Sequence, residues 1–424
     1  MSSGSQSSGS APPGPSSAST PPSEQIVRRK GSSHTGLYAT IAVIVVIVVV
    51  LGGAYAAGIL KFGSKSTTSC AGPTTSVAPA NVATSTPAAV APAVQPAGVT
   101  GQTISGAGST LVNPLMLEWA SKYTNNTVDY SSVGSGAGIA DITEKTQDFG
   151  ASDAPMTPTQ QAAITPKNSV DTIPESAGAA VPIYNLPTIG VPLKFTGQIL
   201  AAIYLGNITN WNNTALQLVN PGVTLPNACI IVVHRSDGSG TTFVWTSFLS
   251  KENTTWNNTI GYATSVNWPV GIGSKGNSGV TTTVKSTVDA IGYVDINYAL
   301  SNAVAVGAVQ NPKGNFVLAN LAHIASAIDD SNLHFPAANA SWYNVSMLNA
   351  PGAEDYPLAT LTYVFVYQNE SAAGYMSTTV AGALVDFLHW IVTVGQSYSA
   401  ELYYVPLPAG VVSSDQATIN SIVL

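Results

Sequence analysis

One strand-to-helix connection constrains the fold of this chain more than any other stretch. Residues 228–233 are an apolar run that predicts a buried strand, and the apolar positions of residues 243–249 suit one face of a helix. The glycine- and hydroxyl-rich turn between them leaves backbone N–H groups uncovered at a helix N-terminus, where the helix dipole favours an anion. Arg235 lies in this turn and is the only arginine after residue 30. A single guanidinium beside such a turn predicts bidentate hydrogen bonding to an oxyanion.

Strand, turn and helix recur along the chain from about residue 102 onwards. The predicted elements are strands at 102–105, 127–132, 148–151 and 358–367, and helices at 111–123, 139–145 and 380–394. Recurrent βα units are typical of α/β proteins with parallel sheets, whose ligand loops lie at the carboxyl ends of the strands.

The charge content excludes one class of partner. The chain is 45% hydrophobic and only 8% charged, against roughly 25% charged residues in an average soluble protein. Residues 118–424 contain nine basic and twenty acidic residues, a net charge of 9 − 20 = −11. Because affinity for a phosphate backbone needs a basic face, we expect no nucleic-acid partner.

The N-terminal hundred residues differ from the remainder. Their composition predicts a disordered cytoplasmic tail at 1–36, a transmembrane helix at 37–60 and a Pro-, Ser-, Thr- and Ala-rich stalk at 61–101. Three basic residues precede the apolar run and two follow it, so the positive-inside rule places the tail in the cytoplasm and the body outside. The alternative is a cleaved export signal, but no Ala-x-Ala site ends the run. We therefore expect a single-pass protein of the cell membrane.

Glycosylation sequons occur only after the predicted membrane segment, which fits an exported domain. The candidate asparagines are Asn125, Asn207, Asn212, Asn253, Asn257, Asn339, Asn344 and Asn369. Together with the low charge content, these sites favour a surface that does not depend on ion pairs, and we hypothesise an archaeal or acid-facing envelope.

Three strand-to-helix turns share a glycine, a hydroxyl and bare amides. The first turn contains Ser109 and Thr110, the second contains Ser135, and the third contains Ser239 and Thr241. A fourth loop carries Asp153. None has the Walker spacing with its lysine or the dinucleotide-binding fingerprint, so nucleotide binding is disfavoured.

Catalytic chemistry is also disfavoured. Ser239, His234 and Asp237 lie too close along one loop to build a catalytic triad. The sequence has no H-E-x-x-H motif and no paired-cysteine signature, so we expect no metal, no cofactor and no enzymatic activity. Cys229, within the predicted strand, is expected to be a small buried apolar residue.

Several of these segments, in order, resemble a known family. They are residues 106–110, 133–138, 148–155, 234–241, 267–271, 276–279 and 291–294. They are similar to the phosphate-binding protein of the high-affinity phosphate ABC importer, from about residue 102 to the end. The resemblance implies a two-domain class II periplasmic-binding-protein fold with a ligand cleft between the domains.

The resemblance also implies where the domains divide. Domain I would comprise 102–177 and 354–424, and domain II would comprise 178–353. The Pro- and Gly-containing segments 173–178 and 351–355 would neighbour the hinge strands.

Carried over residue by residue, the resemblance implies a phosphate site. It would comprise Thr110, Leu111, Ser135, Asp153, Arg235, Ser239, Gly240 and Thr241, with Asp237 bracing Arg235. Leu111 occupies a position that is often Phe in the family, and its contribution would be its backbone amide. The implied partners are inorganic phosphate and the permease and ATPase subunits of the importer, with a monomeric receptor.

Asp153 would set the choice of anion. An ionised carboxylate only accepts hydrogen bonds, so it can face an anion only when the anion brings a proton. Phosphate has that proton near neutral pH, whereas sulfate does not and would leave Asp153 without a donor. The alternatives are an extracellular phosphoesterase or adhesion protein that reuses the fold, or a receptor for another tetrahedral oxyanion such as arsenate or a phosphonate.

Overall fold

The computed structural model describes residues 98–424, except residues 168 and 332. The predicted tail 1–36, the predicted membrane helix 37–60 and most of the predicted stalk 61–101 lie outside the described residues. Within the part that is described, no helix is both long and apolar enough to cross a membrane.

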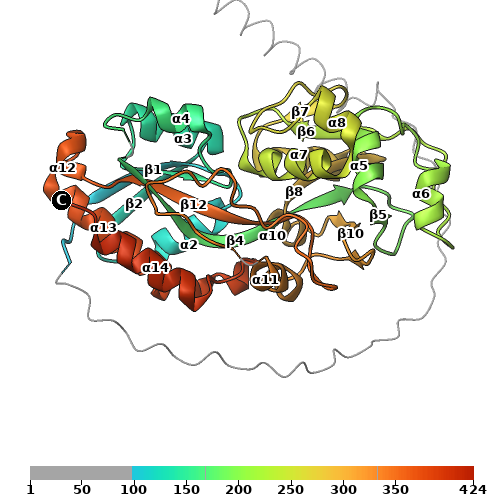
Figure 1. The fold of residues 1–424 in the computed structure, drawn as a ribbon. Coiled ribbons are helices and arrows are strands. Elements are labelled where there is room, and N and C mark those ends of the chain that lie inside the picture. The colour runs from blue at the N-terminus through green and yellow to red at the C-terminus, as the bar shows by residue number, and fades with distance from the viewer. Residues whose placement is uncertain (1–97, 168, 332) are drawn as a thin grey trace, which may run out of the picture. The chain divides into compact units, whose positions relative to one another are not determined.

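Nine strands of the described residues form one mixed sheet, in the order β2-β1-β3-β12-β4-β8-β6-β7, with β9 also paired to β4 (Figure 1). Their bounds are β1 Thr103–Gly108, β2 Thr127–Ser132, β3 Phe149–Ser152, β4 Val170–Tyr184, β6 Ile231–Arg235, β7 Ile272–Ser274, β8 Ala290–Asp295, β9 Ala305–Val306 and β12 Ala359–Tyr367. A second sheet of three strands contains β5 Lys194–Phe195, β10 Ala308–Gln310 and β11 Phe316–Val317.

Both ends of the large sheet contain parallel pairs, as the recurrent βα units predict. At one end β1 runs parallel to β2 and β3, and at the other β6 runs parallel to β7 and β8. The central strands β12 and β4 are antiparallel to each other, and β4 is antiparallel to β8. The connections that follow β1, β2, β3 and β6 carry the predicted site residues, as expected for strand carboxyl ends.

Helices cover the half of the sheet that contains β1, β2 and β3. They are α2 Asn113–Lys122, α3 Ser135–Glu144, α4 Pro158–Ala163, α12 Glu370–Ala373, α13 Thr378–Val392 and α14 Ala409–Asn420. Side chains of α2 and α13 share one buried cluster with Val364 and Val366, whereas Ile139 and Ile142 of α3 share another with Phe365 and Tyr367. All residues of β12 are buried, and its sequence is mostly apolar, interrupted only by Thr360 and Thr362.

Further helices pack around the other half of the sheet. They are α5 Gly197–Tyr204, α6 Thr214–Val219, α7 Gly240–Glu252, α8 Thr254–Thr259, α9 Gly276–Ser286, α10 Ile296–Ser301 and α11 Leu321–Asp330. Helix α7 packs on α5 and β8, and α9 packs on β6 and β8. These contacts hold the N-termini of α7 and α9 beside the end of β6.

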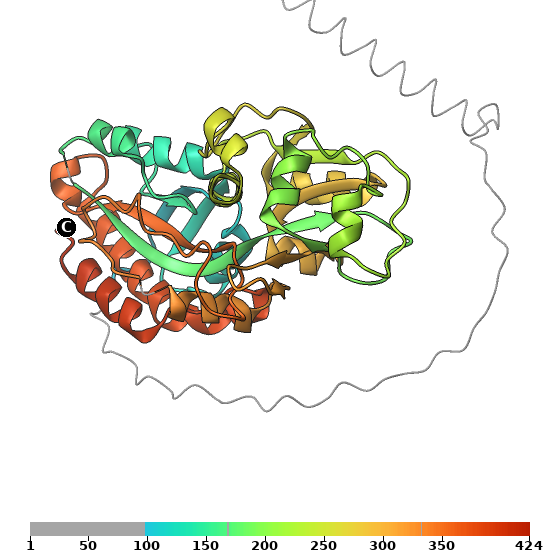
Figure 2. The same cartoon turned by 45° about the vertical axis from the view of Figure 1, so that its right-hand side comes forward.

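The strand β4 links the two halves of the sheet (Figure 2). It pairs with β12 through residues 170–179 and with β8 through residues 180–184, and every residue of the strand is buried. The segment 173–178, expected next to a hinge strand, therefore lies inside this strand. A proline fits there because the ladder has a bulge at this point.

Two local expectations need correction. Strand β1 continues to Gly108, because residues 106–108 pair with β3. Helix α2 starts only at Asn113, because the Ser109 hydroxyl accepts a hydrogen bond from the Leu111 amide and the chain forms a turn there. Cys229 is exposed and precedes β6, where it makes only an isolated bridge with Asn210. The apolar run therefore extends beyond the strand, and the prediction of a buried Cys229 was wrong.

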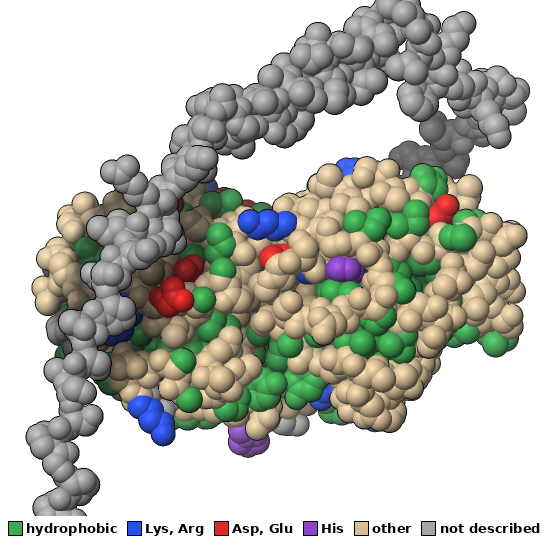
Figure 3. Space-filling model, turned by 90° about the horizontal axis from the view of Figure 1, so that it is seen from above, with side chains coloured by type: hydrophobic (Ala, Val, Ile, Leu, Met, Phe, Trp, Pro, Cys, Tyr) green, Lys and Arg blue, Asp and Glu red, His purple; other side chains and the backbone are tan. Residues whose placement is uncertain are grey.

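Charged side chains are sparse on the surface that Figure 3 shows. Two ion pairs among the described residues are Lys122 with Glu118 and Arg235 with Asp237. The first is an exposed helix pair, and the second lies at the candidate site described next.

Candidate anion-binding site

The turn between β6 and α7 forms one side of the candidate site. The strand ends at Arg235 and the helix begins at Gly240, with Ser239 as the N-cap residue. The Ser239 hydroxyl accepts from the Thr242 amide at 3.0 Å, which leaves its own proton available to a ligand. The amides of Gly240 and Thr241 belong to the first helical turn, where the helix supplies no acceptor.

Arg235 is buried and only part of its guanidinium has a protein partner. Its Nε donates to Asp237 Oδ1 at 2.8 Å and its Nη2 donates to Asp237 Oδ2, while Nη1 has no partner among the described residues. Burial by itself would raise the pKa of Asp237, but the hydrogen bond and the positive charge of Arg235 outweigh burial and lower it. The pair therefore stays ionised and presents an unsatisfied NH₂ group of the charged guanidinium.

A buried aromatic group fixes the end of β6. The Tyr293 hydroxyl accepts from the Arg235 amide at 3.2 Å and contacts the Thr242 hydroxyl at 2.6 Å. The Tyr293 ring stacks on Trp245 with ring centroids 5.0 Å apart. Burial raises the pKa of Tyr293 to about 12, so it stays a neutral donor and acceptor.

Asp153, in the loop after β3, forms the opposite side of the site and is buried. Its Oδ1 accepts from the Ser109 hydroxyl at 2.5 Å and from the Thr362 hydroxyl at 3.2 Å. Its backbone amide donates to the Ser135 hydroxyl at 3.3 Å. Burial raises the pKa of Asp153 to about 6, although these hydroxyls and the charge of Arg235 oppose the shift. The carboxyl is therefore mostly ionised at neutral pH.

Thr110 and Leu111 are both buried, and their groups are already partly engaged. The Thr110 hydroxyl oxygen accepts from the backbone amide and the side-chain amide of Asn277, at 3.2 and 3.0 Å. The Leu111 amide, the group predicted to contact the anion, donates to the Ser109 hydroxyl at 2.9 Å. To bind an anion as well, the Leu111 amide would have to share its proton between the Ser109 hydroxyl and the ligand. The role of Leu111 therefore stays a prediction.

Direct contacts join the two sets of loops. The Gly136 amide donates to the Gly238 carbonyl at 3.0 Å, and the Asn277 side chain lies within 3.3 Å of the Thr241 hydroxyl as well as contacting Thr110. A Cβ added to Gly240 would lie 2.5 Å from Asp153 Oδ2, so only glycine allows this approach. The structure thus brings the eight predicted residues and Asp237 into one buried region.

Four further residues take part that were not among the predicted site residues, although Ser109 lies in one of the three predicted turns. They are Ser109, Glu175, Asn277 and Thr362. Glu175 was detectable, because a carboxylate within a run of apolar residues indicates a buried charge with a specific partner. Thr362 had no comparable signal, since threonine is common in strands.

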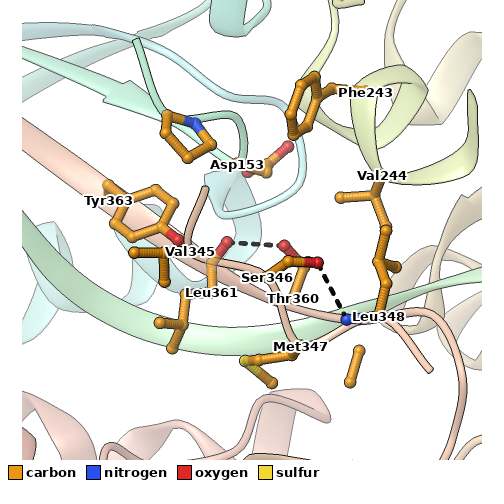
Figure 4. A pocket seen from close by; sticks show the side chains of 12 residues that line it. Asp153, Phe243, Val244, Val345, Ser346, Met347, Leu348, Thr360, Leu361 and Tyr363 are labelled. Atoms are coloured by element: carbon orange, nitrogen blue, oxygen red, sulfur yellow. Dashed lines mark hydrogen bonds between the residues drawn. The ribbon is translucent and has the colours of Figure 1, made fainter. Parts of the chain in front are cut away.

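A small cavity opens beside Asp153 (Figure 4). Its lining includes Phe243 and Val244 of α7, the loop residues Val345 and Leu348, and Tyr363 of β12. Apart from Asp153 the labelled side chains are mostly apolar, and the lining residues include no cation that could pair with the Asp153 carboxylate.

The glycosylation candidates differ in exposure. Asn207, Asn257 and Asn344 are exposed, whereas the other five are half-buried. The side-chain amides of Asn125 and Asn253 already donate to Asp386 and Gln198, at 2.9 and 2.8 Å. Glycan attachment at any of these sites stays a prediction.

Within the described residues, no group of three or more His, Cys, Asp or Glu side chains could hold a metal ion. The region offers hydrogen-bond donors, the guanidinium of Arg235 and the carboxyl groups of Asp153, Asp237 and Glu175.

Comparisons with known proteins identify the family. Residues 85–394 match the model of a PBP superfamily domain. The phosphate-binding protein PstS of Pasteurella multocida is 40% identical over 325 residues, which cover 74% of this chain and 89% of the relative. The chain belongs to the PstS family of phosphate-binding proteins. The PstS protein of Methanocaldococcus jannaschii is 33% identical and aligns with 74% of this chain and 85% of its own length.

Solved structures support the fold of this PstS-family chain. A high-affinity periplasmic phosphate-binding protein, PfluDING, bound with phosphate, matches with a TM-score of 0.60 at 20% identity and covers 74% of this chain and 93% of its own. A phosphate-binding protein from Stenotrophomonas maltophilia matches with a TM-score of 0.56 at 18% identity, with the same coverage. The predicted periplasmic-binding-protein fold is confirmed. The relatives are named as binding proteins, which confirms the expectation of a function other than catalysis.

Proposed function

We propose that this protein captures inorganic phosphate outside the cell and delivers it to an ABC-type importer. The main observation behind this proposal is the buried Arg235, whose Nη1 has no protein partner in the described residues. Asp153 lies in the same group of loops. A buried guanidinium N–H without an acceptor is costly unless a ligand satisfies it. The names of the family members support phosphate as that ligand.

Each residue of the proposed site has a chemical role that suits a protonated tetrahedral anion. Arg235 would donate a charge-assisted hydrogen bond, and the Ser239 and Ser135 hydroxyls would donate neutral ones. The amides of Gly240 and Thr241 would add the favourable end of the α7 dipole. Asp153 would accept the proton of the phosphate, which a fully ionised sulfate cannot offer.

The proposed domains meet at the site. Domain I, 102–177 with 354–424, would supply Thr110, Ser135 and Asp153, and domain II, 178–353, would supply Arg235 and the α7 turn. The proposed boundary at 177/178 lies within two residues of the point where β4 changes partner from β12 to β8. Closure of one domain on the other would complete the set of donors around the anion.

The proposed location is the outer side of the cell membrane. The apolar segment 37–60 would anchor the chain, and residues 61–101 would carry the binding domains away from the bilayer, towards the importer's permease. The solved relative described as periplasmic supports a location outside the cytoplasm.

The test is native mass spectrometry of the full chain, purified in detergent without added phosphate, followed by calorimetry with phosphate. We expect a bound anion with the mass of phosphoric acid, and its loss in Arg235→Ala. Lys251→Ala is the matched control, because it removes a cation from the opposite end of the same helix. A parent protein that carries no anion and gives no heat with phosphate would refute the proposal.

A further inference from the structure

A second carboxylate lies buried behind Asp153. The side chain of Glu175 on β4 is fully buried, and the Thr362 hydroxyl lies 3.0 Å from its Oε1. The same hydroxyl lies 3.2 Å from Oδ1 of Asp153. One threonine hydroxyl therefore connects the two acids.

The strand register explains why Glu175 faces this way. Thr362 pairs with Ser176 and Tyr363 pairs with Pro174, so Glu175 is the extra residue of a β-bulge between β4 and β12. A bulge turns a side chain out of the normal alternation, and bulges are frequent beside binding sites. Here the bulge allows Glu175 to reach Thr362 in the direction of Asp153.

The number of protons decides what this contact can be. A threonine hydroxyl has one proton to donate and lone pairs that accept, whereas an ionised carboxylate only accepts. With both acids ionised, Thr362 could satisfy only one of them. Both contacts are hydrogen bonds only when one carboxyl carries a proton and donates it to the Thr362 oxygen.

The surroundings assign that proton to Glu175. Asp153 also accepts from Ser109 and is attracted by Arg235, whereas Oε2 of Glu175 has no partner among the described residues. Burial, and then the negative charge of Asp153, raise the pKa of Glu175 to about 8.

Within the part of the chain that the structure describes, no neighbouring group offsets this assignment. The other titratable groups that interact electrostatically with the two carboxylates are themselves acids, so none of them supplies a positive charge. They are Tyr130 of β2, Asp295 of β8, Tyr298 of α10, Tyr363 of β12 and Tyr404. Arg235 is the cation that acts on Asp153, and it is already paired with Asp237.

We propose that Glu175 donates a proton to Thr362, which in turn donates to Asp153, and that this relay keeps Asp153 an ionised acceptor for the protonated anion. The inference rests on the proposed phosphate site. Glu175 is a positioning residue, because it acts through Thr362 and need not touch the anion. Loss of its proton removes one hydrogen bond and places a second negative charge behind the site, so anion affinity falls as pH rises.

The test is calorimetric titration of the full chain in detergent with inorganic phosphate, from about pH 7 to about pH 9.5, a range that spans loss of a proton from a carboxyl with a strongly raised pKa. We compare the parent with Glu175→Gln, because glutamine imitates the neutral acid and cannot lose the proton. The parent is expected to lose roughly tenfold more affinity than Glu175→Gln across this range, as expected for a like charge added nearby. Parallel profiles for the two proteins would overturn the relay.

Variants of Thr362 test the connection and do not depend on the folding of Glu175→Gln. Thr362→Val removes the hydroxyl with little change of shape and should lower affinity at neutral pH by about tenfold, the typical worth of one buried hydrogen bond. Thr362→Ser keeps the hydroxyl and should retain both the affinity and the pH profile of the parent. Equal behaviour of the valine and serine variants would also overturn the relay. A parent that binds no phosphate at any pH would instead refute the proposed function.

Discussion

The free energy of unfolding of this protein should fall as pH rises from mildly acidic to mildly basic, and Asp415 isolates one cause. Asp415 lies on α14, which packs against α13 and β4, and it is 4% exposed. Its Oδ2 has no partner among the described residues, and burial raises its pKa from 3.8 to about 8. The folded protein therefore keeps a proton there that the unfolded chain releases.

The sign and size of the effect follow from that difference in proton binding. Stabilisation by the raised pKa is complete below the unfolded value of 3.8 and is lost as pH rises through about 8. Each pH unit within this window changes the free energy of unfolding by about 1.4 kcal/mol per proton. Between about pH 5 and about pH 8 the contribution of Asp415 is therefore at most about 4 kcal/mol.

The assay is urea denaturation of the full chain in detergent at several pH values in this range, for the parent and Asp415→Asn. The asparagine cannot titrate, so its free energy of unfolding should change less steeply with pH. Other buried acids, among them Glu370 and Asp171, affect both proteins equally and cancel in the comparison of slopes. Asp129→Asn, on an exposed side chain, is the control. Equal slopes for the parent and Asp415→Asn would show that the argument from burial is wrong.

Three other predictions concern the site. Asp153→Asn should narrow the preference for phosphate over sulfate at neutral pH by roughly 10- to 100-fold, because the amide can donate to sulfate; calorimetry with both anions measures this, and unchanged discrimination would contradict it. In the parent, sulfate should begin to compete with phosphate for the site as pH falls through about 6, the raised pKa of Asp153. Below that pH the carboxyl is protonated and can donate a hydrogen bond to sulfate. Sulfate competition that does not change down to about pH 5 would count against the role of Asp153. Gly240→Ala should lower phosphate affinity by at least about tenfold, because the new Cβ would lie 2.5 Å from Asp153 Oδ2. The matched control is Gly410→Ala, whose added Cβ has nothing within 4 Å. Equal phosphate affinities of the two variants would refute the steric argument.

The buried acids also bear on the hypothesis of an acid-facing envelope. The pKa values of Glu175, Glu370 and Asp415 are each raised to about 8, with burial as the leading cause. These groups are neutral in mild acid, so acidification does not create unpaired buried charges at them. A loss of fold on mild acidification would contradict both this account and the hypothesis.

The sequence by itself determined the elements whose signals are local. The bounds of β2 at Thr127–Ser132 were predicted as they are, and β12 and α13 were predicted to within two residues at each end, because side-chain periodicity and caps are properties of neighbouring residues. The turn from Arg235 to Thr241 was found for the same reason. Its glycines, hydroxyls and single arginine lie within seven consecutive positions.

Only the tertiary structure decided which distant residues meet. The contact between Thr362 and Glu175 joins positions 187 apart, and it depends on a bulge that no local pattern announces. Likewise, the apolar run around Cys229 could not show where pairing with β8 and β7 begins. Burial of Arg235, Asp153 and Glu175 together comes from the contacts between loops and helix starts that belong to the two halves of one sheet. These contacts remove water, and the removal of water sets the proton state of each carboxyl.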